Sequence, residues 1–207
     1  MSDAATGFDP AIALIEFSSI AAGIEAGDAM VKSSPIGSIY AGTVHPGKYL
    51  VLVSGDTASV EEALAKGIEV GRTAVLATVF LPDIHPAVTG AIAGAGPAAW
   101  LAGESLGIVE TETVAAVIEA ADAGVKAADV ELSAVRLADG LGGKGYALFT
   151  GVVGDVGAAL EAAVDRCADA LVESRLIPQL HDEMAENLGR DLTFLERMAM
   201  RPSERGG

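Results

Sequence analysis

The sequence predicts an α/β (α+β) fold built from two tandem copies of one small domain, each a sheet with helices packed on it. Three observations lead to this prediction. The chain has 207 residues, enough for two domains of about 100 residues each. Its second half repeats motifs of the first half at a nearly constant offset. Within each half, short β-branched runs alternate with segments of helical periodicity.

The repeat is visible along the whole unit. Two segments recur 94 positions further on, namely Ile12–Phe17 as Leu106–Thr111 and Ile24–Lys32 as Ile118–Lys126. An insertion of two residues then raises the offset to 96, at which Gly47-Lys48 matches Gly143-Lys144 and Leu81–His85 matches Ile177–His181. We therefore expect domains at residues 10–95 and 104–187, a Gly/Ala/Pro-rich linker at 96–103, and extensions at 1–9 and 188–207.

The first unit begins with a strand and a helix. Residues 11–17 form an apolar run that predicts a buried strand. From Ser18 on, apolar residues recur at helical spacing, and Ser18 or Ser19 can cap that helix. Pro35 ends it.

Two strands, a second helix and a last strand follow. The runs 36–44 and 48–54 predict strands joined by a tight His45-Pro46-Gly47 turn. A helix is expected at 57–70, started by Asp56 or Thr57, and a strand at 74–81. The order strand, helix, strand, strand, helix, strand recurs in the second unit, which predicts a mixed or antiparallel sheet with helices on one face.

Charge and composition exclude several classes of partner. Thirteen basic against 29 acidic residues give a net charge of −16 with no Lys/Arg cluster, so nucleic acid and anionic membranes are poor partners. The uncharged stretch 84–103 is broken by Gly and Pro, so we interpret it as the end of one unit and a linker. With one cysteine and no leader pattern at its start, the chain is expected in the cytoplasm.

The segment Gly140–Gly145 satisfies G-x-G-x-x-G literally. A dinucleotide site needs this motif to open a helix, whereas Tyr146–Thr150 is a strand pattern. A Walker loop fails because neither Ser nor Thr follows Lys144.

The remaining chemistry-bearing residues favour structural roles. His85 and His181 follow a strand-ending Pro at matched positions, which favours helix-start or interface histidines over a shared metal site. Cys167 falls among apolar residues of the second helix of the second unit and is predicted to be a core residue. Glu16 and Glu110 sit in apolar strands, where a hydrogen-bonded carboxylate at a subunit contact is favoured over a general-acid pair. No catalytic residue and no metal site is therefore assigned.

Taken together, the motifs resemble a known family. The strand Ile-Ala-Leu-Ile-Glu of the first unit is matched by Leu-Gly-Ile-Val-Glu in the second. A helix with Asp-Ala-x-Val-Lys, a Gly-containing turn before an apolar strand, and a closing Leu/Ile-Pro-x-x-His each occur twice. This pattern resembles the bacterial microcompartment (BMC) shell domain, and two such domains in one chain resemble the tandem-domain (BMC-T) shell proteins. The resemblance covers residues 10–187 and implies two ferredoxin-like BMC domains.

The resemblance also implies an assembly. A homotrimer would imitate a hexagonal tile, join other shell proteins edge to edge in the microcompartment shell, and enclose enzymes. The lysines of Asp-Ala-x-Val-Lys would lie at the tile edge, but the usual arginine partner is missing. The edge residues are thus Lys32, Lys126, Asp83 and Gln179.

In this family the turn between the second and third strands lines a central pore. The residues at the matching positions are Val44, His45, Pro46 and Gly47 in the first unit and Gly140, Leu141, Gly142 and Gly143 in the second. Three copies of His45 would form a ring whose charge depends on pH. Some relatives hold an iron–sulfur cluster at the pore through a cysteine. Because Cys167 lies in neither turn, no cluster and no other cofactor is expected.

The sequence is thus interpreted as a structural shell protein with a pore for metabolites, and not as an enzyme. The alternative is a tandem ferredoxin-like small-molecule-binding regulatory protein, since that fold also serves as a sensor module. An enzyme ranks last among the three classes.

Overall fold

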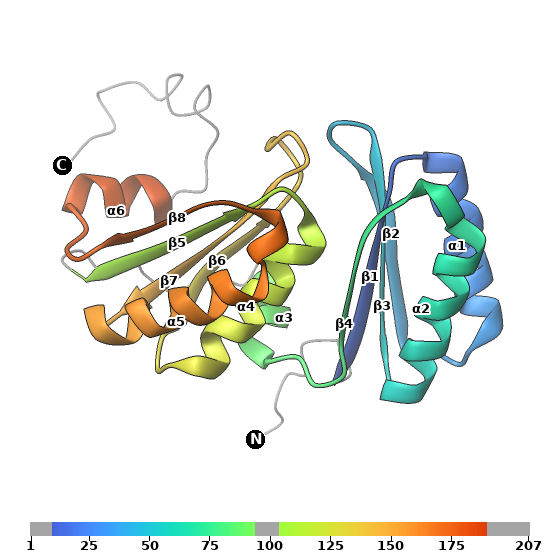
Figure 1. Cartoon of the computed structure of the whole chain (residues 1–207), viewed down its shortest axis with the longest axis horizontal. Helices are drawn as coiled ribbons and strands as arrows, with labels where there is room; N and C mark the ends of the chain where they lie inside the picture. The colour runs from blue at the N-terminus through green and yellow to red at the C-terminus, as the bar shows by residue number, and fades with distance from the viewer. Residues whose placement is uncertain (1–9, 94–103, 190–207) are drawn as a thin grey trace, which may run out of the picture.

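Each half of the chain folds around one four-stranded antiparallel sheet (Figure 1), as a computed structural model describes for residues 10–93 and 104–189. The first domain contains, in chain order, β1 (Ala11–Phe17), α1 (Ile20–Ser33), β2 (Ser38–Val44), β3 (Lys48–Gly55), α2 (Thr57–Gly71), β4 (Val75–Leu81) and α3 (Pro86–Ile92). The second contains β5 (Ser105–Thr111), α4 (Val114–Ala127), β6 (Glu131–Leu137), β7 (Gly145–Gly151), α5 (Val153–Arg166), β8 (Leu171–Ile177) and α6 (Asp182–Gly189). The fold class and the repeated order of elements are confirmed.

The two sheets have matching topology and register. Their strand orders are β2-β3-β1-β4 and β6-β7-β5-β8. Leu14 of β1 pairs with Leu52 of β3, and their repeat counterparts Ile108 and Leu148 pair in the second sheet. The duplication visible in the sequence is therefore a duplication of the sheet itself.

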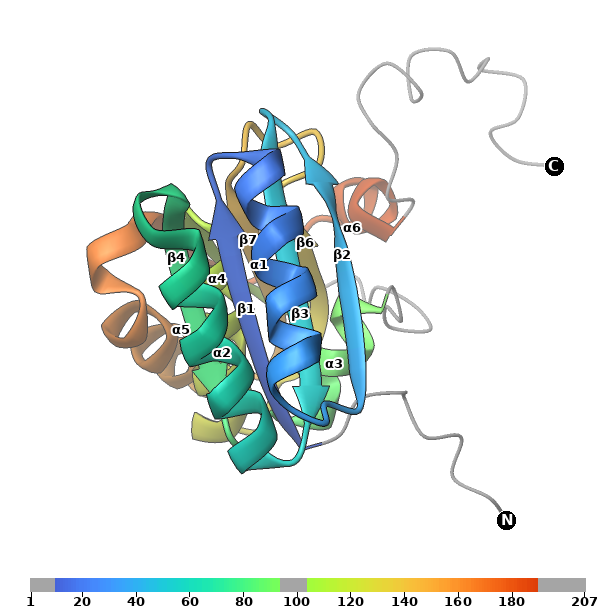
Figure 2. The same ribbon diagram turned by 90° about the vertical axis from the view of Figure 1, so that its right-hand side faces the viewer.

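Side-chain caps start the helices where the sequence places them. The Ser19 hydroxyl accepts a hydrogen bond from the Ala22 N–H at the start of α1. The Asp56 carboxylate does the same for Ser59 at the start of α2, and the hydrogen bonds from Ser59 lower the pKa of Asp56. Helices α1 and α2 then lie together on one face of the first sheet (Figure 2).

Helix α4 lies between two sheets, because it packs on its own sheet and also against β1 and β4 of the first domain (Figure 1). Its Val114, Ile118 and Ala121 belong to a core cluster that also contains Leu14 and Val79 of the first domain. One continuous apolar core thus joins the two domains.

Two features differ from the sequence-based prediction. Helix α3 occupies part of the stretch interpreted as the end of a unit and a linker; Pro86 suits its first turn and His85 caps it, so the proline starts a helix there. Helix α6 packs on the face of the second sheet that α4 and α5 do not cover, and helix α3 packs against β6 and α4 of the second domain, whereas the prediction placed helices on one face only. The predicted linker 96–103, the extension 1–9 and most of the extension 188–207 lie outside the described residues. No helix within residues 10–93 and 104–189 is long and apolar enough to cross a membrane.

Candidate pore and domain interface

The two turns assigned to the pore lie side by side at one end of the interface between the domains (Figures 1 and 2). The first, His45-Pro46-Gly47, joins β2 to β3, and the second, residues 138–144, joins β6 to β7. The His45 backbone N–H donates to Asp139 Oδ1 at 3.4 Å, and His45 Nδ1 lies 3.7 Å from the same oxygen. Both side chains are exposed, so this contact is open to solvent.

The glycine-rich second turn is a backbone loop held by its own hydrogen bonds. Gly140, Gly142 and Gly143 all have positive φ, a conformation that side chains disfavour. The Ala138 N–H donates to the Lys144 carbonyl and closes the loop. Strand β7 follows directly, so the literal G-x-G-x-x-G does not open a helix, and the strand predicted after this motif is confirmed.

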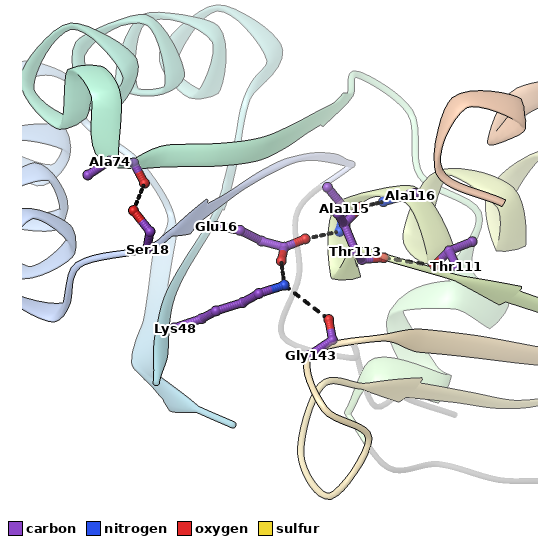
Figure 3. A network of polar contacts seen from close by, with 9 residues as sticks. All are labelled: Glu16, Ser18, Lys48, Ala74, Thr111, Thr113, Ala115, Ala116 and Gly143. Atoms are coloured by element: carbon purple, nitrogen blue, oxygen red, sulfur yellow. Dashed lines mark hydrogen bonds and ion pairs between the residues drawn. The ribbon is translucent and has the colours of Figure 1, made fainter. Parts of the chain in front are cut away.

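Glu16 is the buried polar centre of the interface (Figure 3). One carboxylate oxygen accepts a hydrogen bond from the Ala115 N–H at 2.8 Å, at the N-terminus of α4. The other lies 3.2 Å from Lys48 Nζ, which also donates to the Gly143 carbonyl at 3.2 Å. A carboxylate at a helix N-terminus compensates the helix dipole and satisfies a free N–H. Glu16 therefore ties β1, β3, α4 and the second pore turn together.

Glu110 and Lys144 repeat this pair in the second domain without the same surroundings. Glu110 Oε1 lies 2.8 Å from Lys144 Nζ, and the side chains are 36% and 40% exposed, against 0% for Glu16 and 17% for Lys48. The hydrogen bond and negative charge of Glu110 raise the pKa of Lys144. The prediction of a hydrogen-bonded structural carboxylate is confirmed for Glu16, which lies at a contact between domains of one chain.

A second polar cluster lies at the opposite end of the interface. Asp83 follows Leu81, which pairs with Ile12 at the far end of β1 from Glu16. Lys126 Nζ donates to the Asp83 carbonyl and lies 2.7 Å from Asp122 Oδ2. Asp122 Oδ1 accepts the His85 N–H at 2.8 Å.

The structure thus brings together two of the four residues assigned to a tile edge, Lys126 and Asp83. Lys32 instead pairs with Asp28 on its own helix at 2.5 Å, and Gln179 is exposed. An edge role for the four residues stays a prediction.

His85, His181 and Cys167 have the structural roles expected of them. The Nδ1 atoms of His85 and His181 accept from the N–H groups of Ala87 and Glu183 at the starts of α3 and α6, which confirms helix-start histidines. Cys167 is buried directly after α5, one residue beyond the helix on which it was predicted, and burial raises the pKa of its thiol. Within the described parts of the chain, no three His, Cys, Asp or Glu residues gather as a metal site.

Sequence reasoning missed several partners that complete the interface. Asp122, Asp139 and the Ala115 N–H all contact residues of the first domain. Asp122 carried one signal, since it matches Asp28 in the repeat. The Ala115 N–H, which donates to the carboxylate of a residue 99 positions away, carried none.

Comparison with known proteins places the chain in a family. The BMC domain model matches residues 11–84 and again 105–180. The bacterial microcompartment shell protein PduT of Citrobacter freundii is 40% identical over 176 residues, which cover 84% of this chain and 95% of that protein.

Two further relatives match at the scale of one domain and of the whole fold. The major carboxysome shell protein CsoS1A of Halothiobacillus neapolitanus is 40% identical over 91 residues, 42% of this chain and 88% of that protein. The crystal structure of a microcompartment protein from Desulfitobacterium hafniense superposes with a TM-score of 0.75 at 38% identity, covering 85% of this chain and 98% of that one.

Proposed function

The chain belongs to the BMC domain family as a tandem-domain structural shell protein of a bacterial microcompartment, and from this premise we propose that three copies close into a pseudohexameric ring whose central pore passes small metabolites. The observation that carries the proposal is the meeting of the two repeat-related turns beside one interface. Repetition of that interface around an axis places six turns, two from each chain, around a common centre.

The pore is lined, in this proposal, by residues 44–47 and 140–143. Glycine at the narrowest point lets backbones approach, and His45 and Asp139 supply titratable groups that solvent reaches. An imidazole changes its charge between pH 5 and 8, so a ring of three His45 side chains makes passage of charged metabolites pH-dependent.

The outer rim of the ring contacts other shell proteins edge to edge. We assign Lys32, Lys126, Asp83 and Gln179 to this rim, because the Lys126 cluster lies at the end of the interface away from the pore turns. Enzymes enclosed by the shell are further partners.

The mass of the assembly tests the ring. Sedimentation equilibrium is expected to give 62.4 kDa, three times the 20.8 kDa of the chain, and electron microscopy at high concentration is expected to show sheets. A 20.8 kDa species with neither rings nor sheets, or a monomer that binds a metabolite between its domains, would refute it.

The pore is tested separately by His45→Ala. The variant is expected to keep the assembled mass and to lose the pH dependence of solute flux through sheets or reconstituted rings. Lysine at the same position is the matched control, since it holds its charge through this pH range. If His45→Ala abolishes assembly, the side chain serves packing and the pore assignment is wrong.

A further inference from the structure

The lysines beside the two pore turns are already paired with carboxylates. Lys48, the residue after the first turn, lies 3.2 Å from Glu16 Oε2 and is 17% exposed (Figure 3). Lys144, at the end of the second turn, lies 2.8 Å from Glu110 Oε1, and the hydrogen bond and charge of this carboxylate raise the pKa of Lys144. A close pair of opposite charges has no net charge, so neither lysine gives the turns a positive potential.

Asp139 is the carboxylate that these lysines leave uncompensated. Its side chain is 69% exposed, and its Oδ1 accepts the His45 N–H, which keeps it where the two turns meet. Within residues 10–93 and 104–189, the basic group in ion-pair contact with it is the His45 imidazole, at 3.7 Å. The matching position of the first turn is Thr43, so each chain carries one such carboxylate. While His45 is neutral, the junction of the turns is negatively charged.

The surroundings of Asp139 do not cancel this charge. A Cβ added to Gly140 or Gly142 would meet no atom within 4 Å, so the tip of the second turn is open to solvent. The base of the turn carries Glu112, after β5, and Arg136, on β6. Because these two charges are opposite in sign, the net charge of the region stays that of Asp139.

We propose that Asp139 makes the pore selective for cations, so that cationic and neutral metabolites pass more readily than carboxylates and phosphates. The inference rests on the proposed ring, in which three junctions, and therefore three Asp139 side chains, surround one centre. A ring of carboxylates raises the local concentration of cations and lowers that of anions. The net charge of −16 on each chain acts in the same direction.

His45 sets the pH range of the selectivity. A neutral imidazole leaves the charge of Asp139 in place, whereas an imidazolium at 3.7 Å compensates it. Imidazoles gain their proton as the pH falls from about 8 to about 5, so the preference for cations is expected to be strongest at the alkaline end and to disappear at the acidic end. The same two side chains thus determine both the sign of the selectivity and its pH dependence.

Charged thiol reagents measure the potential at the pore. Leu141→Cys places a thiol in the second turn, two residues from Asp139. Methanethiosulfonate reagents that carry a trimethylammonium or a sulfonate group are compared, and their rate ratio is divided by the ratio for mercaptoethanol. In the assembled ring at pH 8 we expect the cationic reagent to be favoured by about threefold or more. The wild-type chain, treated in parallel, measures any reaction at the buried Cys167.

Two amide variants in the Leu141→Cys chain assign the potential to one side chain. Asp139→Asn keeps an oxygen for the His45 N–H but removes the charge, so it should reduce the rate ratio by about threefold. Asp129→Asn is the matched control, because Asp129 is an exposed carboxylate before β6, at the end of that strand away from the turn. It changes the total charge equally and should leave the ratio unchanged. Equal effects of the two variants overturn the inference.

The pH dependence is tested with His45→Ala in the same Leu141→Cys chain. The rate ratio should fall from pH 8 to pH 5 when His45 is present and should stay high in the variant, because the charge of Asp139 then has no imidazolium beside it. Sedimentation equilibrium verifies that each variant keeps the assembled mass. A ratio that falls equally in both chains overturns the role of His45.

The outcomes separate this inference from the proposed ring. A wild-type chain that stays monomeric at every concentration refutes the ring and the inference with it. A trimer whose rate ratio at pH 8 is about one, or does not respond to Asp139→Asn, leaves the ring and overturns the cation selectivity. A trimer that favours the cationic reagent, and loses this preference in Asp139→Asn and at pH 5, supports both.

Discussion

The pairs Glu16–Lys48 and Glu110–Lys144 are the same residues at matched positions of the two domains, yet their surroundings differ. The first pair is covered by the second domain, which brings the N-terminus of α4 to Glu16 and the Gly143 carbonyl to Lys48. The second pair is half-exposed. The two domains thus carry the same pair of residues, but the other domain covers only the pair of the first domain.

The interiors of the two domains show a second difference, an exchange of large and small side chains. In the first domain Gly23 of α1 faces Tyr49 of β3, whereas at the matching positions Val117 of α4 faces Gly145 of β7. A Cβ on Gly23 would lie 2.6 Å from the Tyr49 ring, and one on Gly145 would lie 2.4 Å from Val117. In each pair the glycine leaves the space that the larger side chain of the facing element fills.

The largest effect is expected at the buried carboxylate. Glu16→Ala removes the partner of Lys48 and of the Ala115 N–H, so it should destabilise the chain by about 3–5 kcal/mol, whereas Glu110→Ala should change the dissociated chain by about 1 kcal/mol or less. Urea denaturation at concentrations where the chain is monomeric measures both. Equal losses would show that the covered and the open pair do not differ in energy.

The exchanged pair gives the next effect. Gly23→Val overpacks the α1 contact with Tyr49 and should cost about 1–3 kcal/mol. Adding Tyr49→Gly recreates the pair of the second domain, and the double variant should be more stable than the sum of the two single changes predicts, by about 1 kcal/mol or more. Additive losses in a denaturation cycle would contradict the exchange.

Cys167 provides a chemical comparison, since Gly71 occupies its position in the first domain. Burial raises the pKa of the thiol, so less thiolate forms at a given pH. Its reaction with a thiol reagent at pH 8 should be at least about tenfold slower than in urea-unfolded chain, and should accelerate as pH rises. A native rate equal to the unfolded rate would place the thiol at the surface.

The smallest effect is expected at the pore turn. His45 and Asp139 are both exposed, so their contact adds little, and His45→Ala should change the free energy of unfolding by less than about 0.5 kcal/mol. A larger change in thermal melting would mean that the turn helps hold the domains together.

Much of the local structure could be predicted from residues alone. The predicted strand 11–17 coincides with β1, and the helix starts at Ser19 and Asp56 lie at the expected caps. These elements depend on near neighbours in the chain: apolar period, a capping oxygen, a proline. Helix α3 was not predicted, because Pro86 and Gly90 taken with their neighbours in the chain indicate a loop. Its Val88 and Ala91 are buried against the second domain, and this contact is not visible in the local sequence.

The sequence by itself determined that this protein is a duplicated domain. It also determined most of the elements of each copy and the family pattern, because repeats and periodicity depend only on the order of residues along the chain. The tertiary structure decided which of two equal carboxylates is buried, since that depends on which neighbour covers each sheet. It also placed α4 between two sheets, whereas α1 leaves Ile20, Ile24 and Val31 exposed. The same pair of residues is covered in one domain and half-exposed in the other, because only in the first domain does the N-terminus of a helix from the other domain reach the carboxylate.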